Sequence, residues 1–108
     1  MSIEVPIPDL PDRLSLYPWA FLVTAGAEGS PRALAVPTVW RDGALRASVG
    51  ARTRDNLVAR PTVSLLCPGT DGREYSLIID GTAAVDGDEV AITPTWAVLH
   101  RPALQGDE

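Results

Sequence analysis

The chain has 108 residues, a formal net charge of -5, one cysteine and one histidine. This length fits one domain over residues 1–108, and so short a chain gains stability when an apolar face is covered by association. A single cysteine excludes an internal disulfide and a cysteine-based zinc site. Because the sequence shows no other cluster of metal ligands, we expect no metal site.

The charge of the chain is segregated along the sequence. All nine cations are arginines, and six of them lie in the segment 32–60 with only two aspartates, a formal charge of +4 that leaves -9 for the rest. Nucleic-acid binding needs a broad basic surface, which an acidic chain with one basic segment does not offer. We therefore expect no nucleic-acid partner, and a small anion suits the basic segment better.

The N-terminal sequence and the hydropathy pattern indicate a soluble protein. The segment MSIEVPIPDLPDRL lacks the basic stretch and apolar run of a signal peptide. No apolar run approaches the roughly 20 residues of a membrane span. We expect a cytoplasmic protein with no membrane partner.

The first half of the chain predicts one short helix and three strands. Residues 9–16 suit a short helix with Asp9 as N-cap. Strands are predicted over 17–25, 32–40 and 44–49. Pro37 cannot donate to a ladder, so it indicates an edge, a bulge or an opening in the second strand. The pair Asp42-Gly43 predicts a tight hairpin, because both residues tolerate positive φ.

The second half predicts a further helix and three strands. Thr53 is the expected cap of a short helix that Pro61 ends. A buried strand follows at 62–67, then a loop at 68–73, a long strand, a turn at 86–88 and a short last strand within 74–93. The tail 94–108 is expected to hold one helical turn. These elements predict an all-β, β-rich fold, a six-stranded barrel or sandwich with one or two short helices.

The arginines at the start of the second helix have two interpretations. In one, Arg52 and Arg54 are solvated and pair with Asp55 or another carboxylate, each pair contributing about 0 to 1 kcal/mol. In the other, backbone N–H groups and two guanidinium groups meet one anion at the helix start. A cation in the first turn opposes the helix dipole by roughly 0.3 to 1 kcal/mol, and a bound phosphate would reverse that sign. Arg60 needs no ligand, because a cation suits the far end of the helix.

Other residues that could carry chemistry lack the partners that the chemistry needs. His100 invites a general-base role, but no partner is visible in the sequence. Cys67 ends an apolar strand and suits the core better than a nucleophile's place. The three tryptophans suit the core or an interface, with Trp40 of interest because it follows Pro37. We therefore place the candidate chemistry in the basic segment.

The segment FLVTAGAEGSPRALAVPTVWRDGALRASVGARTRDNLVARPTVSLL resembles the pyridoxamine 5'-phosphate oxidase-like family, the flavin-binding split β-barrels. FLVT with the GSPR turn is similar to the family's first hairpin. VPTVWRDGAL is similar to its second and third strands, and SVGARTRDNLVARP to its phosphate-binding helix. With IIDGTAAV as a later strand, the resemblance runs from Trp19 to about Val85.

The resemblance implies a homodimer of six-stranded split barrels with flavin sites between the two chains. Family members hold the flavin phosphate on the loop and helix after the third strand, assisted by an arginine early in the second strand, and lay the ring along that strand's backbone. The matching positions for the phosphate are Arg32, Ser48, Arg52, Thr53, Arg54 and Asn56, and those for the ring are Val36, Pro37, Thr38, Val39 and Trp40.

Departures from the family pattern leave three functional hypotheses. The loop reads Arg-Thr-Arg where Ser-Arg-Lys is commoner, Pro37 removes one backbone N–H, and the substrate residues of true pyridoxamine phosphate oxidases have no counterpart. The first hypothesis is an FMN-dependent oxidoreductase or reductase acting on a small molecule. The second exchanges FMN for the deazaflavin F420. The third is a cofactor-free dimer that serves as a binding or structural module.

Overall fold

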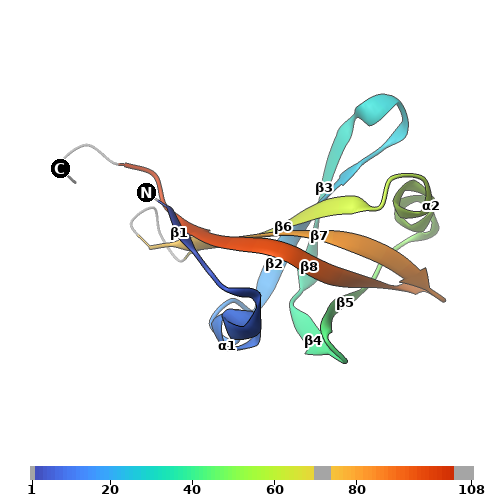
Figure 1. The fold of residues 1–108 in the computed structure, drawn as a ribbon. Coiled ribbons are helices and arrows are strands. Elements are labelled where there is room, and N and C mark those ends of the chain that lie inside the picture. Colours follow the sequence, from blue (N-terminus) through green and yellow to red (C-terminus); the bar gives the residue numbers. More distant parts are fainter. Residues whose placement is uncertain (1, 70–73, 104–108) are drawn as a thin grey trace.

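The computed structural model describes residues 2–69 and 74–103, and it is dominated by one antiparallel sheet (Figure 1). The strands are β1 (Ser2–Glu4), β2 (Trp19–Ala25), β3 (Pro31–Pro37), β4 (Val39–Arg41), β5 (Ala44–Ser48), β6 (Thr62–Cys67), β7 (Ser76–Asp86) and β8 (Glu89–His100). The helices are η1 (Ile7–Asp9), α1 (Leu10–Leu14), η2 (Ala27–Gly29) and α2 (Ala51–Ala59). The predicted β-rich class with two short α-helices is confirmed.

The sheet is curled because its two end strands are neighbours in the sequence. Its order is β3-β2-β6-β7-β8-β5-β4, and β1 pairs with β8 outside that path. Thr38 alone separates β3 at one end from β4 at the other. A single residue cannot cross the width of a flat sheet, since a residue spans at most about 3.6 Å. The two ends must therefore approach each other, and the sheet forms a half-barrel.

The core fills the concave side of this sheet. Along β2, Ala20, Leu22 and Thr24 are buried, while Trp19 and Phe21 face outward, as the two-residue period of a strand requires. β6 and most of β7 alternate in the same way. The helices add Leu10, Leu14 and Leu57 to the same core. α1 and α2 lie at well-separated places along the sheet (Figure 1).

The predicted count of six strands is not confirmed, because residues 2–69 and 74–103 form eight. The prediction missed β1, which lies in a proline-rich segment and is held only by pairing with β8. It also treated 32–40 as one strand, whereas the chain leaves the ladder at Thr38 and forms β3 and β4. The expected helical turn after residue 94 is wrong as well, since pairing with β7 extends β8 to His100. Pro37 does end an edge strand, as predicted.

One of the two predicted helix caps is at its predicted position. Asp9 is the N-cap residue of α1, but it has helical backbone angles as the last residue of η1, and its side chain makes no capping hydrogen bond. The predicted cap at Thr53 is wrong. Thr53 lies inside α2, which begins two residues earlier with Gly50 as its N-cap. The helix is therefore longer at its N-terminal end than the threonine suggested, and its first turn has no side-chain cap.

The predicted tight turns are confirmed by their backbone angles. Asp42 and Gly43 have φ of 54° and 77°, and Gly87 in the turn after β7 has φ of 66°. These are the positive values that short hairpins between antiparallel strands demand. Most of the predicted 68–73 loop lies outside the described residues. Among the described residues no helix is long and apolar enough to span a membrane.

Replacing Gly81 with alanine tests how tightly the β7–β8 hairpin is packed. A Cβ there would lie 2.7 Å from the Thr93 carbonyl oxygen and 2.9 Å from Ile92 Cγ2, beside the register shift at Asp80/Gly81. We expect Gly81→Ala to lower the free energy of unfolding by about 1 to 3 kcal/mol, as overpacking does. Urea unfolding followed by circular dichroism measures it. The control Thr82→Ala, at an exposed neighbouring position, should change the free energy of unfolding by no more than about 0.5 kcal/mol. Equal urea midpoints for the two variants would contradict tight packing around Gly81.

Candidate functional site

A pocket of about 300 Å³ opens where the strand ends β3, β4 and β5 meet β8. Pro37, Val39 and Ser48, all predicted site residues, line it. Ser48 faces outward because Leu45, Ala47 and Val49 of the same segment are buried in the core. The remaining lining residues are Arg41, Arg46, Ala47 and Glu89. Part of the predicted site therefore converges on one hollow.

Two ion pairs cross the pocket between the β4–β5 hairpin and the end of the β7–β8 hairpin. Arg41 Nη2 lies 2.8 Å from Glu89 Oε1, with both side chains partly exposed. Arg46 Nη1 lies 3.5 Å from Asp86 Oδ2, and Asp86 is largely exposed. Register places Ser48 opposite Glu89, so the basic hairpin and these acids share one face of the sheet. Exposed pairs of this kind contribute about 0 to 1 kcal/mol each.

The start of α2 lies directly after the pocket strand and is open. Gly50 is the N-cap with no side-chain capping bond, and a Cβ at that position would meet nothing within 4 Å. The first N–H groups of a helix have no acceptor within the helix. The Arg54 N–H does bond to the Gly50 carbonyl at 3.0 Å. The open first turn therefore offers free N–H groups to an anion.

The arginines of this turn make no ion pair with a described carboxylate. Arg52 is exposed, and Arg54 is half-buried with its Nη1 donating to the Val49 carbonyl. The ion pairs among the described residues involve Arg41 and Arg46 and neither of these two. The pairing of Arg52 and Arg54 with Asp55 or another carboxylate, which the first interpretation expected, is therefore not present among the described residues. The Arg54 side chain instead bonds to the loop between β5 and α2.

Arg32 and Asn56 approach each other from different elements. Arg32 Cγ, on β3, and Asn56 Nδ2, on α2, each lie 3.8 Å from the position that a Cβ on Gly26 would take. Arg32 Nη1 donates to the Pro31 carbonyl at 3.0 Å, and the side chain remains exposed. Both side chains lie near Gly26, so the fold places a cation and an amide beside α2.

The predicted ring strand, 36–40, divides between the core and the pocket. Val36 is buried and Trp40 packs against the core. The Thr38 N–H donates to the Pro18 carbonyl at 3.1 Å, and its hydroxyl donates to the Tyr17 carbonyl. Pro37 has no N–H, so the backbone donors at 37 and 38 are not free for a ligand. Pro37 and Val39 remain to border the pocket with their side chains.

Sequence reasoning missed Arg41 and Arg46 as pocket residues. Both belong to the basic segment, and the strand alternation already placed Arg46 on the outward side with Ser48. The missing information was the contact of the β4–β5 hairpin with β8, which is distant in sequence. The outward pattern of charges on that hairpin was the signal that pointed to them.

His100 and Trp96 lie far from this pocket in the same chain. Glu89 begins β8 and His100 ends it, a separation of about 35 Å at the usual rise per residue of a strand. His100 Nδ1 and Ser2 Oγ are 3.1 Å apart, and the Trp96 indole N–H donates to Glu4 at 3.4 Å. Within one chain, these residues belong to the β1–β8 edge.

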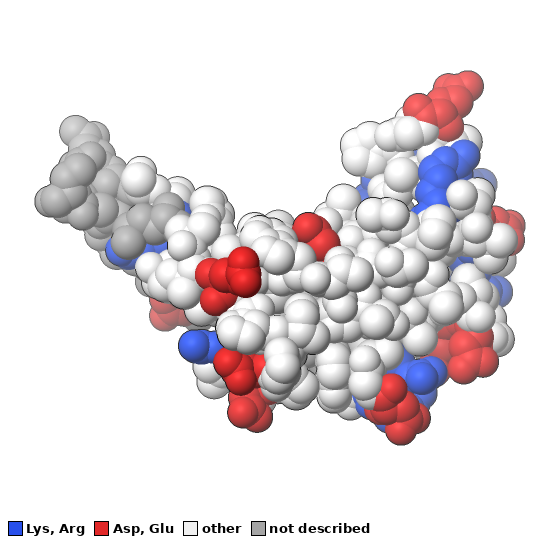
Figure 2. All heavy atoms as spheres, viewed as in Figure 1, with Lys and Arg blue, Asp and Glu red and all other residues white. Residues whose placement is uncertain are grey.

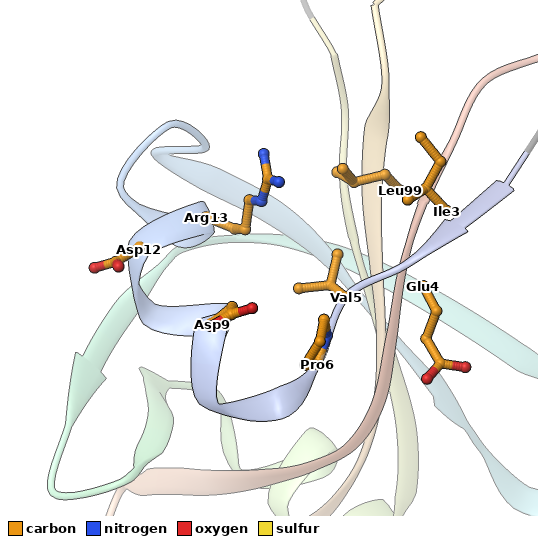
Figure 3. Close-up of a pocket in the computed structure, with 8 residues that line it drawn as sticks. All are labelled: Ile3, Glu4, Val5, Pro6, Asp9, Asp12, Arg13 and Leu99. Atoms are coloured by element: carbon orange, nitrogen blue, oxygen red, sulfur yellow. The ribbon is translucent and has the colours of Figure 1, made fainter.

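A second hollow, of about 260 Å³, lies between α1 and β1 (Figure 3). Its lining includes the carboxylates of Glu4, Asp9 and Asp12, and Figure 3 shows Glu4 and Asp12 pointing away from each other on opposite sides. Within the described residues no group of three histidine, cysteine or acidic side chains is placed to hold a metal ion. The carboxylates of this hollow therefore do not converge on one ligand position, unlike the arginine and serine side chains of the pocket at the ends of β3, β4 and β5.

The chain has the split-barrel fold of solved pyridoxamine 5'-phosphate oxidase-like proteins, the fold that the resemblance indicated. The solved structures with this fold include a Listeria innocua protein proposed to be a pyridoxamine 5'-phosphate oxidase (TM-score 0.74, 13% identity, 86% of this chain and 96% of that chain). A Mesorhizobium loti FAD-binding protein gives a TM-score of 0.71 at 15% identity (92% and 96%). An F420 reductase gives 0.64 at 17% identity (77% and 93%).

In sequence the chain is 40% identical over 112 residues to the uncharacterized protein Mb0449c of Mycobacterium bovis, a match that covers 87% of this chain and 75% of that protein. A Mycobacterium tuberculosis protein matches to the same extent. The chain belongs to the family of these mycobacterial proteins. No protein-family model matches it.

Cys67 provides a test of the core at the other end of the sheet from the pocket, where β6 pairs with Leu77 of β7. Burial raises the pKa of its thiol to about 12, so the thiol stays protonated at pH 8 and only the thiolate is nucleophilic. We expect no alkylation by iodoacetamide at pH 8 in the native protein and complete alkylation in 6 M guanidinium chloride, read by intact mass. Rapid labelling of native protein would contradict the burial of this residue.

Proposed function

We propose that this chain is a homodimeric oxidoreductase that binds FMN and acts on a small molecule. The observation that carries the proposal is the uncapped start of α2, directly after the strand that borders the pocket. A phosphate group and a flat ring joined by a short chain match a helix start and a neighbouring pocket. The flavin would supply the electron transfer, and the protein would supply binding and electrostatics.

The phosphate is proposed to lie at the first turn of α2. Its ligands would be the free N–H groups there, the hydroxyls of Ser48 and Thr53 and the guanidinium groups of Arg52 and Arg54. Arg32 and Asn56 flank Gly26 beside the same helix and would complete the positive rim. The helix dipole and charge-assisted hydrogen bonds from arginine both favour a phosphate at this position. These groups fit a phosphate because no described carboxylate competes for them.

The ring is proposed to lie against the strand segment 36–40 at the mouth of the pocket. Pro37 and Val39 give it an apolar wall, and Ser48 links the ring end to the phosphate end. Since the backbone donors at 37 and 38 are absent or engaged, packing rather than backbone hydrogen bonds would hold the ring. Apolar walls with a few polar groups are typical of cofactor pockets.

The homodimer is proposed to form through the outer face of the sheet. Trp19, Phe21 and Trp96 expose between 37% and 43% of their surface on this side, and the Trp19 and Phe21 rings pack edge to face with centroids 4.8 Å apart. Figure 2 shows that charged side chains are sparse over the middle of the face in view and gather toward its margins. Aromatic groups with little charge are typical of interface cores.

The outer face continues into the pocket. Trp19 pairs with Pro37 across β2 and β3, and directly opposite residues of an antiparallel pair share one face. A second copy on the aromatic side chains would therefore border the proposed ring site. This continuity favours an active dimer over a dimer without a cofactor, which stays the alternative if no flavin binds.

F420 is the second candidate cofactor, because a solved F420 reductase shares the fold. F420 is a longer anionic cofactor, and its negative charge suits an arginine-rich helix start. The two cofactors would compete for one site, so displacement of one by the other identifies the preferred one.

Binding of FMN and riboflavin tests the phosphate contact. We expect the purified protein to quench FMN fluorescence in a saturable titration and to bind riboflavin, which lacks the phosphate, at least about tenfold more weakly. Arg54→Gln should weaken FMN by a similar factor and leave riboflavin unchanged. Arg60→Gln, at the far end of the same helix, is the matched control and should bind FMN like the wild type. Equal affinity for FMN and riboflavin would place the phosphate elsewhere, and no binding of FMN or F420 would exclude both cofactors.

Substitution of an outer aromatic residue tests the dimer. We expect light scattering after size exclusion to give twice the 11.5-kDa chain mass. Phe21→Lys should shift the protein to the monomer without loss of its circular dichroism spectrum, because this side chain lies outside the core. Leu16→Lys changes an exposed apolar residue just after α1 and should leave the dimer intact. A wild-type monomer at micromolar concentration would contradict the proposed association.

A further inference from the structure

Arg46 is a largely buried cation with weak partners. Its side chain is only 17% exposed, yet its two contacts among the described residues are long. Nε donates to the Arg41 carbonyl at 3.3 Å, and Nη1 lies 3.5 Å from Asp86 Oδ2. A guanidinium carries five N–H donors in a fixed fork. Much of this fork therefore lies at the pocket without a close acceptor from the described part of the chain.

The other walls of the pocket match a small molecule with one acidic end. Pro37, Val39 and Ala47 are apolar, and Ser48 adds one hydroxyl. Arg41 is committed to Glu89 by the shorter ion pair, so these two charges balance each other. One net positive charge remains among the lining residues, and it belongs to Arg46. A single charge suits a carboxylate better than a phosphate dianion, which would need a second free cation.

We propose that this pocket binds a small organic acid, with the carboxylate on Arg46 and the apolar body against the exposed side of the proposed flavin ring, which itself covers Pro37 and Val39. The role of that acid as the substrate rests on the proposed function, because the pocket borders the proposed ring site. The competing carboxylate of Asp86 is 74% exposed, and an exposed pair contributes about 0 to 1 kcal/mol. A ligand carboxylate that meets the fork with two parallel hydrogen bonds is stronger and displaces it.

Benzoate and benzamide test the proposal, because they have the same shape and differ in charge. We expect calorimetric titration of the FMN-loaded wild-type protein to show benzoate binding about tenfold more tightly than benzamide. Arg46→Gln should abolish this preference, and Arg60→Gln should keep it. Asp86→Asn removes the competing carboxylate from an exposed position and should tighten benzoate without affecting benzamide. This second variant keeps the test valid if Arg46→Gln does not fold.

The same titrations separate the acid site from the flavin site. Equal affinities for benzoate and benzamide in the wild type, or a preference that survives in folded Arg46→Gln, would overturn the acid site while FMN binding stands. A benzoate preference that depends on Arg46 in protein that binds no FMN would support the acid site and overturn the flavin proposal alone.

Discussion

The link at Thr38 is the constraint on which the rest of the structure depends. It joins the two ends of a seven-strand path, so the sheet must curl for the chain to pass from β3 to β4. Pro37 ends β3 because it has no N–H to donate. The Thr38 backbone and side chain then bond to the carbonyls of Pro18 and Tyr17, which fixes the crossing to the segment before β2. An edge-strand proline and two hydrogen bonds thus determine where the half-barrel closes.

The site is a consequence of that closure. The curl brings the end of β3 near the β4–β5 hairpin, and the pocket is the space left between them. The chain leaves β5 through Val49 and Gly50, and α2 begins there without a cap. A helix start and a pocket are therefore placed together by a strand that ends in Ser48. β3 and β5 lie near opposite ends of the strand order, so a flat sheet would not bring both of them to one pocket.

The class of fold was predictable from local patterns, and the strand count was not. Alternation and the Asp42-Gly43 turn act over a few residues, and both were correct in the structure. The strand β1 and the extension of β8 depend on each other and on β7, so their existence is decided by long-range pairing. Thr53 suggested a cap because its residue type suits that position. The glycine at position 50 formed the helix start instead, and a glycine N-cap has no side-chain signal.

The candidate site was predictable in part, for a similar reason. The start of α2 follows from one continuous segment, so the sequence alone could group Ser48, Arg52 and Arg54 near one helix start. The acids that pair with Arg41 and Arg46, in contrast, lie in another part of the chain, so local patterns did not indicate them. The β5–β8 register brings acids of the 86–89 turn next to the β4–β5 hairpin. Two of these acids pair with arginines of the hairpin, so the fold neutralises part of the positive charge of the segment 32–60.

The acids neutralise the arginines of the basic segment unevenly. Arg41 has a close partner, Arg46 has a distant one, and no described carboxylate forms an ion pair with Arg32, Arg52 or Arg54. The chain has more acidic residues than arginines. A shortage of acids therefore does not explain why the arginines at the open helix start form no ion pair. Arginines without a close carboxylate partner therefore lie along one path, from Arg46 in the pocket past Ser48 to the first turn of α2. Such a path suits a ligand with an anionic end beside α2 and a reacting partner beside Arg46.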